Sequence, residues 1–366
     1  MTEAEFSKMM RFNNRRRCFV LTPSFGQFTP RKRKEIPPPP WNFSFLVAVS
    51  VYDGDAHCRP AILKSLDALM KISPRTDLLF LNDSESSSTR KDLRDFQYGG
   101  KHGFRNIEIH QIPTVKVCTY EEFLPDFWKF YPYGISGTRG LFQTDLRRSP
   151  KELYKMFTGF SKIIPKREYI RKLAIQRNYD FLFMLDSDLE VEPATLLKLY
   201  LLNCGGAGVL YEGRNIEGVV FYDPLAINLA DWALCPLVEM PRELECDFDG
   251  RRFQPSIIYD PREYCRDNEI SVSGDCGGAV LYRRDVLELS KFVRKDFAPL
   301  RILADDTAFF MGVFLTGRRD IKVTTDVKAI HHLSPAKKRD MQAFENYFNG
   351  KMTLQEYEKA LGTSWA

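Results

Sequence analysis

Apolar runs and amphipathic segments alternate along the chain from residue 43 onward. The run Phe45–Val51 predicts a buried strand, and residues 60–71 carry apolar side chains at helical spacing behind a proline suited to a first helical turn. Alternating strands and helices build parallel sheets. We therefore expect an α/β fold with a Rossmann-like, mostly parallel sheet flanked by helices. The same pattern predicts further strands over 78–81, 107–112, 179–188 and 321–330, and further helices over 89–96, 167–177, 193–202 and from 304 onward.

The most informative of these runs is the apolar segment that ends in Asp186-Ser187-Asp188. Such a run is typical of a strand buried on both faces, and ligands in open α/β sheets bind at the carboxyl ends of strands. Side chains at positions i and i+2 share one face of a strand, so both carboxylates can face one divalent cation or one sugar nucleotide. A hard cation such as Mn²⁺ or Mg²⁺, held by one or two carboxylates, completes its coordination with substrate phosphate oxygens. Two solvated aspartates in a strand-end turn are the simpler alternative.

Small and acidic residues gather again later in the chain. The segment 274–282 opens with Asp275 and contains Gly277 and Gly278 at the expected start of a strand, where the backbone can approach a ligand closely or simply bend. Asp305-Asp306 precede an apolar helix, and a helix N-terminus favours carboxylates. Capping accounts for Asp305 but explains less well why both are needed.

Two adjacent histidines, His331-His332, end the expected strand 321–330. A neutral imidazole is a competent ligand for Mn²⁺. The chain has only five histidines. We keep both readings open, metal ligation by one of the pair and a structural role.

Length and composition allow one large domain or two small ones, because the chain has 366 residues of which 44% are hydrophobic, and this length suits an elaborated α/β enzyme. We place this domain at 43–335, with an aromatic-rich insertion at 113–165 that serves either packing or as a wall or lid on the acceptor side, and a helical extension at 336–366. The eight cysteines are scattered without a CxxC pair, which indicates neither a zinc site nor a disulfide framework.

Basic residues are concentrated at the start of the chain, where residues 1–35 hold nine Lys or Arg against three Glu. With the four prolines of 37–40, residues 1–42 are expected to form a mobile arm, either a solvated tail or a peripheral tether to anionic lipid. Aromatic residues are not interleaved with its basic clusters, so we expect no nucleic-acid partner. No apolar run is long enough to span a membrane, and the start lacks a signal peptide's apolar region. A cytoplasmic, soluble protein is expected, and a membrane-associated or secretory-pathway context would need an anchor outside this sequence.

The order of these segments resembles that of GT-A glycosyltransferases and, more narrowly, of the fungal capsule-associated α-1,3-mannosyltransferases. The likeness extends over residues 43 to 332. It departs from the family in lacking the usual luminal anchor and in carrying Asp305-Asp306 where Glu is frequent. The segments that carry it are Val51-Tyr52, Asn82-Asp83-Ser84-Glu85-Ser86, residues 170–178, Asp186-Ser187-Asp188, Tyr222-Asp223 with Asp231, residues 276–279 and Asp305-Asp306.

The resemblance implies a hexosyltransferase of class EC 2.4 with a GT-A fold, which moves a hexose from a nucleotide-sugar donor to a glycan or glycoconjugate. The implied donor is GDP-mannose, with Mn²⁺ or Mg²⁺ as cofactor and with retention at the anomeric carbon. The implied roles place Val51, Tyr52, Glu85, Arg171, Arg177, Asp186 and Ser187 at the donor, with Glu85 by the nucleoside and the two arginines by the diphosphate or the aspartate loop. They place Asp188, Asp186, His331 and His332 at the metal, Asp223, Gly277 and Gly278 at the acceptor, and Asp306, Asp305 and Asp275 in catalysis.

Two other functions remain as alternatives. Haloacid-dehalogenase phosphatases also carry an aspartate pair after a hydrophobic strand, but on their first strand and with Thr or Val four positions after the first aspartate. Here that position is Glu190, and three strand and helix units precede it. A GT-A fold that binds partners without catalysis is the second alternative. An inverting enzyme with Asp305 or Asp306 as general base fits the residues as well as a retaining one.

Overall fold

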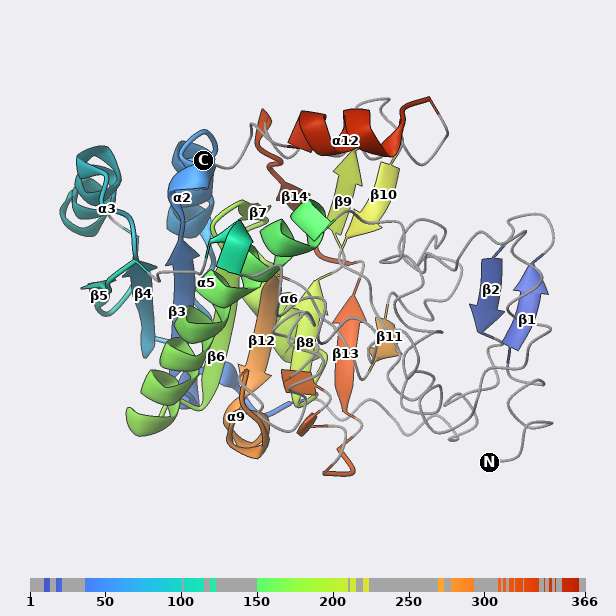
Figure 1. Ribbon diagram of the computed structural model, residues 1–366. Coiled ribbons are helices and arrows are strands. Elements are labelled where there is room, and N and C mark those ends of the chain that lie inside the picture. Colours follow the sequence, from blue (N-terminus) through green and yellow to red (C-terminus); the bar gives the residue numbers. More distant parts are fainter. Residues whose placement is uncertain are drawn as a thin grey trace.

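The computed structural model describes residues 10–13, 18–21, 37–100, 102–114, 119–122, 150–209, 211–214, 220–223, 269–272, 278–292 and 309–361, the last range without 311, 314–315, 319, 325, 336–338, 340–341, 344–345 and 347–350. Within these residues one large sheet organises the molecule, and helices cover both of its faces (Figure 1).

The large sheet has eight strands in the order β11-β13-β8-β12-β6-β3-β4-β5. β3, β4, β5 and β6 are parallel neighbours, and β8 pairs in parallel with β13. β12 runs against both β6 and β8, and β11 runs against β13. The strands are β3 (Phe45–Val51), β4 (Thr76–Asn82), β5 (Ile107–Gln111), β6 (Phe181–Asp186), β8 (Gly206–Val209), β11 (Glu269–Val272), β12 (Ala279–Arg283) and β13 (Ile321–Thr324).

Strand β3 shows how the sequence builds this core, because all seven of its residues are buried. Its alternate side chains enter two separate apolar clusters, one on each face of the sheet. Helices α2 (Arg59–Ala68), α3 (Ser87–Gly99) and α6 (Thr195–Leu201) supply the first cluster, and α5 (Pro150–Gln176) and α9 (Arg284–Leu289) supply the second. The expected α/β class with a mostly parallel, Rossmann-like sheet flanked by helices is confirmed.

A smaller sheet lies at the carboxyl ends of the parallel strands, toward the top of Figure 1, in the order β10-β9-β14-β7. It contains β7 (Leu189–Val191), β9 (Tyr211–Arg214), β10 (Val220–Asp223) and β14 (Ala329–His331). β7 follows β6 after a two-residue turn and pairs antiparallel with β14. This pairing brings His331, the last residue of β14, to the turn that holds Asp188.

Several elements differ from the expectations. The expected strand 321–330 is two strands in two different sheets, β13 and β14, and the antiparallel β12 breaks the expected run of parallel strands. Helix α5 begins at Pro150 and continues through Pro165, so the last part of the expected insertion 113–165 starts this helix. Inside the expected arm, β1 (Met10–Asn13) and β2 (Cys18–Leu21) form an antiparallel pair on either side of its first basic cluster, and β2 is a β-prone apolar run.

The remaining described elements are two 3₁₀ turns, η1 (Pro40–Asn42) and η2 (Asp53–Asp55), and the helix α12 (Leu354–Leu361), which lies in the expected C-terminal helical extension. Among the described residues, no helix combines the length and the apolar character that crossing a bilayer requires.

Candidate active site at the carboxyl ends of the strands

Three parallel strands end side by side at this edge of the sheet. Val51 of β3 pairs with Asn82 of β4, and Ser50 of β3 pairs with Asp186 of β6. On the other side of β6, the antiparallel β12 begins at Ala279 opposite Leu185. The polar residues that follow β3, β4 and β6 therefore converge with the residue that precedes β12, as expected for the binding edge of an open α/β sheet.

Asp186 is fixed by an arginine and by the backbone of Gly278. Arg167 Nη2 on α5 donates to both carboxylate oxygens of Asp186 at 3.0 Å. The Asp186 amide donates to the Gly278 carbonyl at 2.7 Å, and a Cβ on Gly278 would lie 2.4 Å from Asp186 Oδ2. Only glycine at 278 lets the two strands meet here with this carboxylate in place.

Asp188 faces His331. The Asp188 Oδ2 atom lies 3.0 Å from Nε2 of His331, and the two side chains are only 10% and 11% exposed. The backbone reinforces the contact, because the His332 amide donates to the Asp188 carbonyl at 2.8 Å. The His332 ring turns elsewhere, with its Nε2 atom 2.8 Å from Glu190 Oε2. Of the two histidines, only His331 is therefore placed to bind the same cation as Asp188.

A divalent cation fits this donor set. A carboxylate oxygen and an imidazole nitrogen are suitable ligands for Mn²⁺, and sites that use few protein ligands complete the coordination with substrate oxygens. Over the part of the chain that the structure describes, no group of three or more His, Cys, Asp or Glu side chains is placed to hold a metal. Asp188 and His331 would thus provide two ligands, and Asp186 stays engaged with Arg167.

Ser187, between the two aspartates, ties their loop to the loop that follows β3. Its hydroxyl donates to Asp55 Oδ2 at 2.6 Å, and Asp55 is itself buried. The Cys58 thiol donates to the Asp55 carbonyl at 3.2 Å and lies 3.6 Å from the Ser187 carbonyl. The Ser187 side chain therefore holds the aspartate loop in position.

A buried ion pair lies under Val51 and Tyr52. Lys166 Nζ on α5 is 3.0 Å from Asp83 Oδ2, with both side chains buried. The same ammonium lies 3.4 Å from the Val51 carbonyl and 6.0 Å from the centre of the Tyr52 ring. Adjacent residues of α5, Lys166 and Arg167, thus bind the ends of β4 and β6. Neither residue was predicted from the sequence, although both are basic and lie on the helix that precedes the central strand β6.

The structure corrects the expectation for Arg171 and Arg177. Arg171 is buried and donates to Glu168 at 2.8 and 2.9 Å and to the Leu287 carbonyl at 2.7 Å, which joins α5 to α9. Arg177 follows α5 at the start of β6 and donates to Glu108 at 2.7 Å, at the other end of the sheet from Asp186. The helix runs antiparallel to β6, so each turn beyond Arg167 moves an arginine away from the aspartate loop. Arg167 occupies the position expected of them.

The remaining expected residues are only partly described. Glu85 is exposed in the turn after β4. The backbone of Asp223 ends β10, which pairs with β9 in the smaller sheet. The expected residues that lie outside the described ones are Asp275, Gly277, Asp305 and Asp306, together with Asp231.

No family model matches the chain. No curated protein matches it. Among solved structures, it is similar to TarS of S. aureus at a TM-score of 0.42 and 13% identity, over 87% of this chain and 42% of TarS. It is similar to GalNAc-T7, solved with UDP, GalNAc and Mn²⁺, at 0.41 and 9%, over 81% of this chain and 45% of the other. For the mannosyltransferase PcManGT of Pyrobaculum calidifontis, solved with GDP-Man and Mn²⁺, the values are 0.40 and 11%, over 90% and 72%. At these scores the likenesses carry no argument about what this chain does.

Proposed function

We propose that the chain is a metal-dependent glycosyltransferase of the GT-A type, which moves a hexose from a nucleotide-sugar donor to a hydroxyl of a glycan or glycoconjugate. The observation that carries the proposal is the Asp188–His331 pair, whose carboxylate and imidazole lie 3.0 Å apart beside the carboxyl end of β6. A phosphorylated donor supplies the oxygens that such a two-ligand site lacks.

The chemistry requires a nucleoside diphosphate to leave while a hydroxyl attacks the sugar carbon. A cation bound at Asp188 and His331 would neutralise the charge that develops on the leaving diphosphate. The protein's part is to fix that site before the donor binds. Arg167 holds Asp186, Ser187 anchors the loop to Asp55, and backbone pairing sets His331 opposite the loop. Such preorganisation lowers the cost of positioning the donor.

The finer proposal is mannose transfer from GDP-mannose with retention, and it rests on the resemblance to the capsule-associated mannosyltransferases. In this proposal Val51, Tyr52 and Glu85 contact the donor, with Glu85 by the nucleoside. Asp223, Gly277 and Gly278 face the acceptor. Asp306 serves the reaction directly, while Asp305 caps the helix and Asp275 is the next candidate for the catalytic carboxylate. Contact of the basic arm with an anionic membrane also remains a proposal.

Two observations favour sugar transfer over a haloacid-dehalogenase phosphatase. The phosphatase needs Asp186 as an in-line nucleophile, yet both of its carboxylate oxygens accept hydrogen bonds from Arg167. Asp188 pairs with an imidazole, which suits a cation that bridges to a diphosphate.

The test is incubation of the full chain with GDP- and UDP-sugars and Mn²⁺ over a set of glycan acceptors, with release of the nucleotide as the readout. We expect GDP from GDP-mannose, abolished by a chelator and restored by Mn²⁺, and a product with the anomeric configuration of the donor. Release of phosphate from sugar phosphates without nucleotide release would favour the phosphatase. Silence toward every donor and acceptor would favour the binding module.

A further inference from the structure

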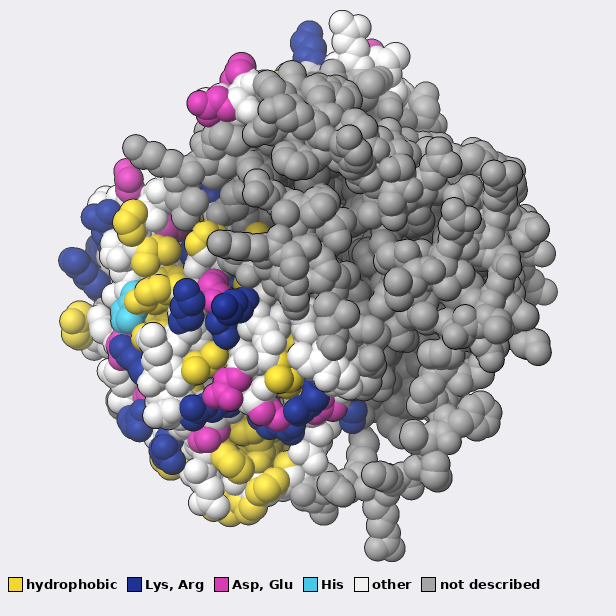
Figure 2. All heavy atoms as spheres, turned by 60° about the horizontal axis from the view of Figure 1, so that its bottom comes forward, with side chains coloured by type: hydrophobic (Ala, Val, Ile, Leu, Met, Phe, Trp, Pro, Cys, Tyr) yellow, Lys and Arg dark blue, Asp and Glu magenta, His cyan; other side chains and the backbone are white. Residues whose placement is uncertain are grey.

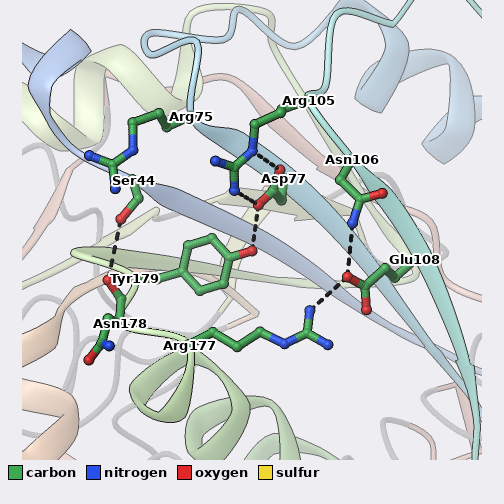
Figure 3. A pocket seen from close by; sticks show the side chains of 9 residues that line it. All are labelled: Ser44, Arg75, Asp77, Arg105, Asn106, Glu108, Arg177, Asn178 and Tyr179. Atoms are coloured by element: carbon green, nitrogen blue, oxygen red, sulfur yellow. Dashed lines mark hydrogen bonds and ion pairs between the residues drawn. The ribbon is translucent and has the colours of Figure 1, made fainter.

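A second polar hollow lies at the amino-terminal ends of the parallel strands, on the side that Figure 2 turns toward the viewer, where basic and acidic side chains of the described residues are interleaved. Its volume is about 520 Å³, within the range of small-molecule pockets. It lies at the opposite end of β4 and β6 from Asp186. Nine residues line it, as Figure 3 shows: Ser44, Arg75, Asp77, Arg105, Asn106, Glu108, Arg177, Asn178 and Tyr179.

The first carboxylate of this pocket, Asp77, accepts hydrogen bonds at both of its oxygens. Arg105 Nε donates to Oδ1 at 2.9 Å, and Arg105 Nη2 donates to Oδ2. The Tyr179 hydroxyl also donates to Oδ2, at 2.5 Å. Burial, together with this hydrogen bond, raises the pKa of Tyr179 to about 12, so the phenol keeps its proton at neutral pH. Asp77 is buried and offers little to a ligand.

The second carboxylate, Glu108, is engaged through both oxygens. Its Oε1 atom accepts from Arg177 Nη1 at 2.7 Å and from Asn106 Nδ2 at 2.9 Å. Its Oε2 atom lies 2.7 Å from Nε2 of His110. The hydrogen bond from Arg177 is the largest of the effects that hold the pKa of Glu108 below its usual value, so this side chain stays an ionised, occupied acceptor.

The donors of the pocket are not exhausted in the same way. A guanidinium has five N–H donors and no acceptor. Arg75 makes a single side-chain bond among the described residues, a 3.4 Å contact from Nη1 to the Asn42 carbonyl. Arg105 and Arg177 use one edge for their carboxylates, and their side chains are 51% and 40% exposed. Three arginines against two carboxylates leave the lining with an excess positive charge.

The C-terminal end of helix α5 does not cancel this excess positive charge. Its last carbonyls would attract cations and repel an anion. The carbonyls of Leu173, Ala174 and Ile175 already accept the amides of the three following residues, 177 to 179, at 3.0 to 3.1 Å. Asn178, with a φ of 58°, makes the left-handed turn that closes the helix this way.

We propose that this pocket is a binding site for a small phosphate-type oxyanion, a phosphate ion or a phosphomonoester, separate from the site at Asp186 and Asp188. The unfilled hydrogen-bonding capacity of its arginines is all donor, and their planar forks match the oxygens of a phosphate. Arg75 is the anchor, because it is the one arginine of the lining that holds no carboxylate.

The test is a titration of the full chain with inorganic phosphate at constant ionic strength, followed through backbone amide NMR signals. We expect saturable shifts at Asn106 and Asn178 and none at Ser187. Arg75→Gln should weaken this binding by about tenfold or more, because it removes a charge-assisted contact without unpairing a carboxylate. Arg94→Gln, on the exposed face of α3, is the matched control and should bind as the unaltered chain does.

Two further experiments decide which class of ligand the pocket binds. A phosphomonoester such as glycerol phosphate should produce the same shifts, and acetate at equal ionic strength should not. The melting temperature of Arg75→Gln should stay within the range of Arg94→Gln, so that weaker binding is not a folding defect. Equal phosphate affinity of the two variants, shifts confined to residues 186–188, or acetate binding as strong as phosphate would each overturn the proposal.

Discussion

At the carboxyl ends of the parallel strands Asp188 lies against an imidazole, whereas at their amino-terminal ends Asp77 and Glu108 are held by arginines. An imidazole can turn its lone pair to a cation that the carboxylate also binds. A guanidinium has no lone pair to offer, so it satisfies the carboxylate and competes with any cation. Arginine partners thus disfavour a cation at Asp77 and at Glu108, even though Glu108 also lies 2.7 Å from Nε2 of His110. The imidazole beside Asp188 is compatible with one.

The same criterion divides the aspartates of the candidate active site. Asp186 is bound by Arg167 through both oxygens, as the carboxylates of the amino-terminal pocket are bound by their arginines. Asp188 instead lies against the imidazole of His331. The motif that looks symmetrical in the sequence therefore contains one carboxylate held by an arginine and one that faces an imidazole.

The largest effect is expected at Asp188, the proposed metal ligand. We expect Asp188→Ala to lower turnover of the nucleotide-sugar reaction by at least about 100-fold, since loss of outer-shell partners of metals alone costs about 10- to 100-fold. The fold should persist, because the residue lies in a turn after β6. Steady-state rates at saturating Mn²⁺ and a circular dichroism spectrum check both parts.

A matched control for that variant is Glu190→Gln, which alters the carboxylate that pairs with the other histidine, His332. We expect it to retain most of the activity, with unchanged apparent affinity for Mn²⁺. If Glu190→Gln lost activity as Asp188→Ala does, both histidines would belong to the metal site. The distinction between His331 and His332 would then be wrong.

The second prediction concerns the arginine that fixes Asp186. Arg167→Gln should lower turnover about 10- to 100-fold, because Asp186 would no longer be fixed. It should raise the apparent Mn²⁺ affinity, because it removes a positive charge and frees a second carboxylate near the cation. Arg167→Lys should restore part of the loss. Arg171→Gln should instead lower stability, by about 3–5 kcal/mol if Glu168 stays charged and buried, with little direct effect on metal affinity. Similar Mn²⁺ titrations for the two glutamine variants would refute the assignment of Arg167.

The third prediction concerns Gly278, where a methyl group would lie 2.4 Å from Asp186 Oδ2 and 2.7 Å from Leu189 Cδ1. Gly278→Ala should lower the free energy of unfolding by about 1–3 kcal/mol and reduce turnover, because either the strand or the carboxylate must shift. Gly159→Ala, in α5 with no atom within 4 Å of the added methyl, should raise stability by about 0.5–1 kcal/mol. Thermal unfolding of both variants, and turnover of the first, test this contrast.

The sequence predicts those features of the fold and the site that depend on local interactions, and it does not predict those that depend on contacts between distant segments. The apolar run before Asp186 predicts its own burial and its position at a strand end, and both are found. The choice between Arg167 and Arg171 depends on how α5 lies against β6, which no local pattern encodes. The choice between His331 and His332 depends on the pairing of β14 with β7, which are far apart in the sequence. The contact of His332 with Glu190, for example, joins residues that are 142 positions apart.

The reversed strand β12 shows the same limit. Its first four residues are buried and mainly apolar, as in any buried strand. Its direction follows from pairing with β6 and β8 rather than from its own sequence. The amino-terminal pocket was missed for a related reason. Its arginines come from three separate connections of the sheet, and each reads in the sequence as an ordinary surface charge.

The smallest expected effect lies again at the amino-terminal end of the sheet, where Arg283 of β12 aligns with Phe181, the first residue of β6. Arg283 and Arg318 donate to Asp285 at 2.7 Å each. Burial acts to raise the pKa of Asp285, but these hydrogen bonds outweigh it and lower the pKa to about 2. Because the folded pKa is below the usual 3.8, the pair stabilises the fold above about pH 4 and loses this contribution as the pH falls toward 2.

We therefore expect Asp285→Asn to be less stable than the unaltered chain at pH 6, by less than about 1 kcal/mol because the Asp285 side chain is 45% exposed, with the difference vanishing near pH 2. Added salt should shrink the difference further, since exposed pairs are screened. Melting temperatures of both proteins from pH 6 to pH 2, at low and high salt, measure it. If the melting temperatures of the two proteins differed by the same amount from pH 6 to pH 2, Arg283 and Arg318 would not stabilise the ionised Asp285. The contrast between carboxylates held by arginines and Asp188 would then not extend to Asp285.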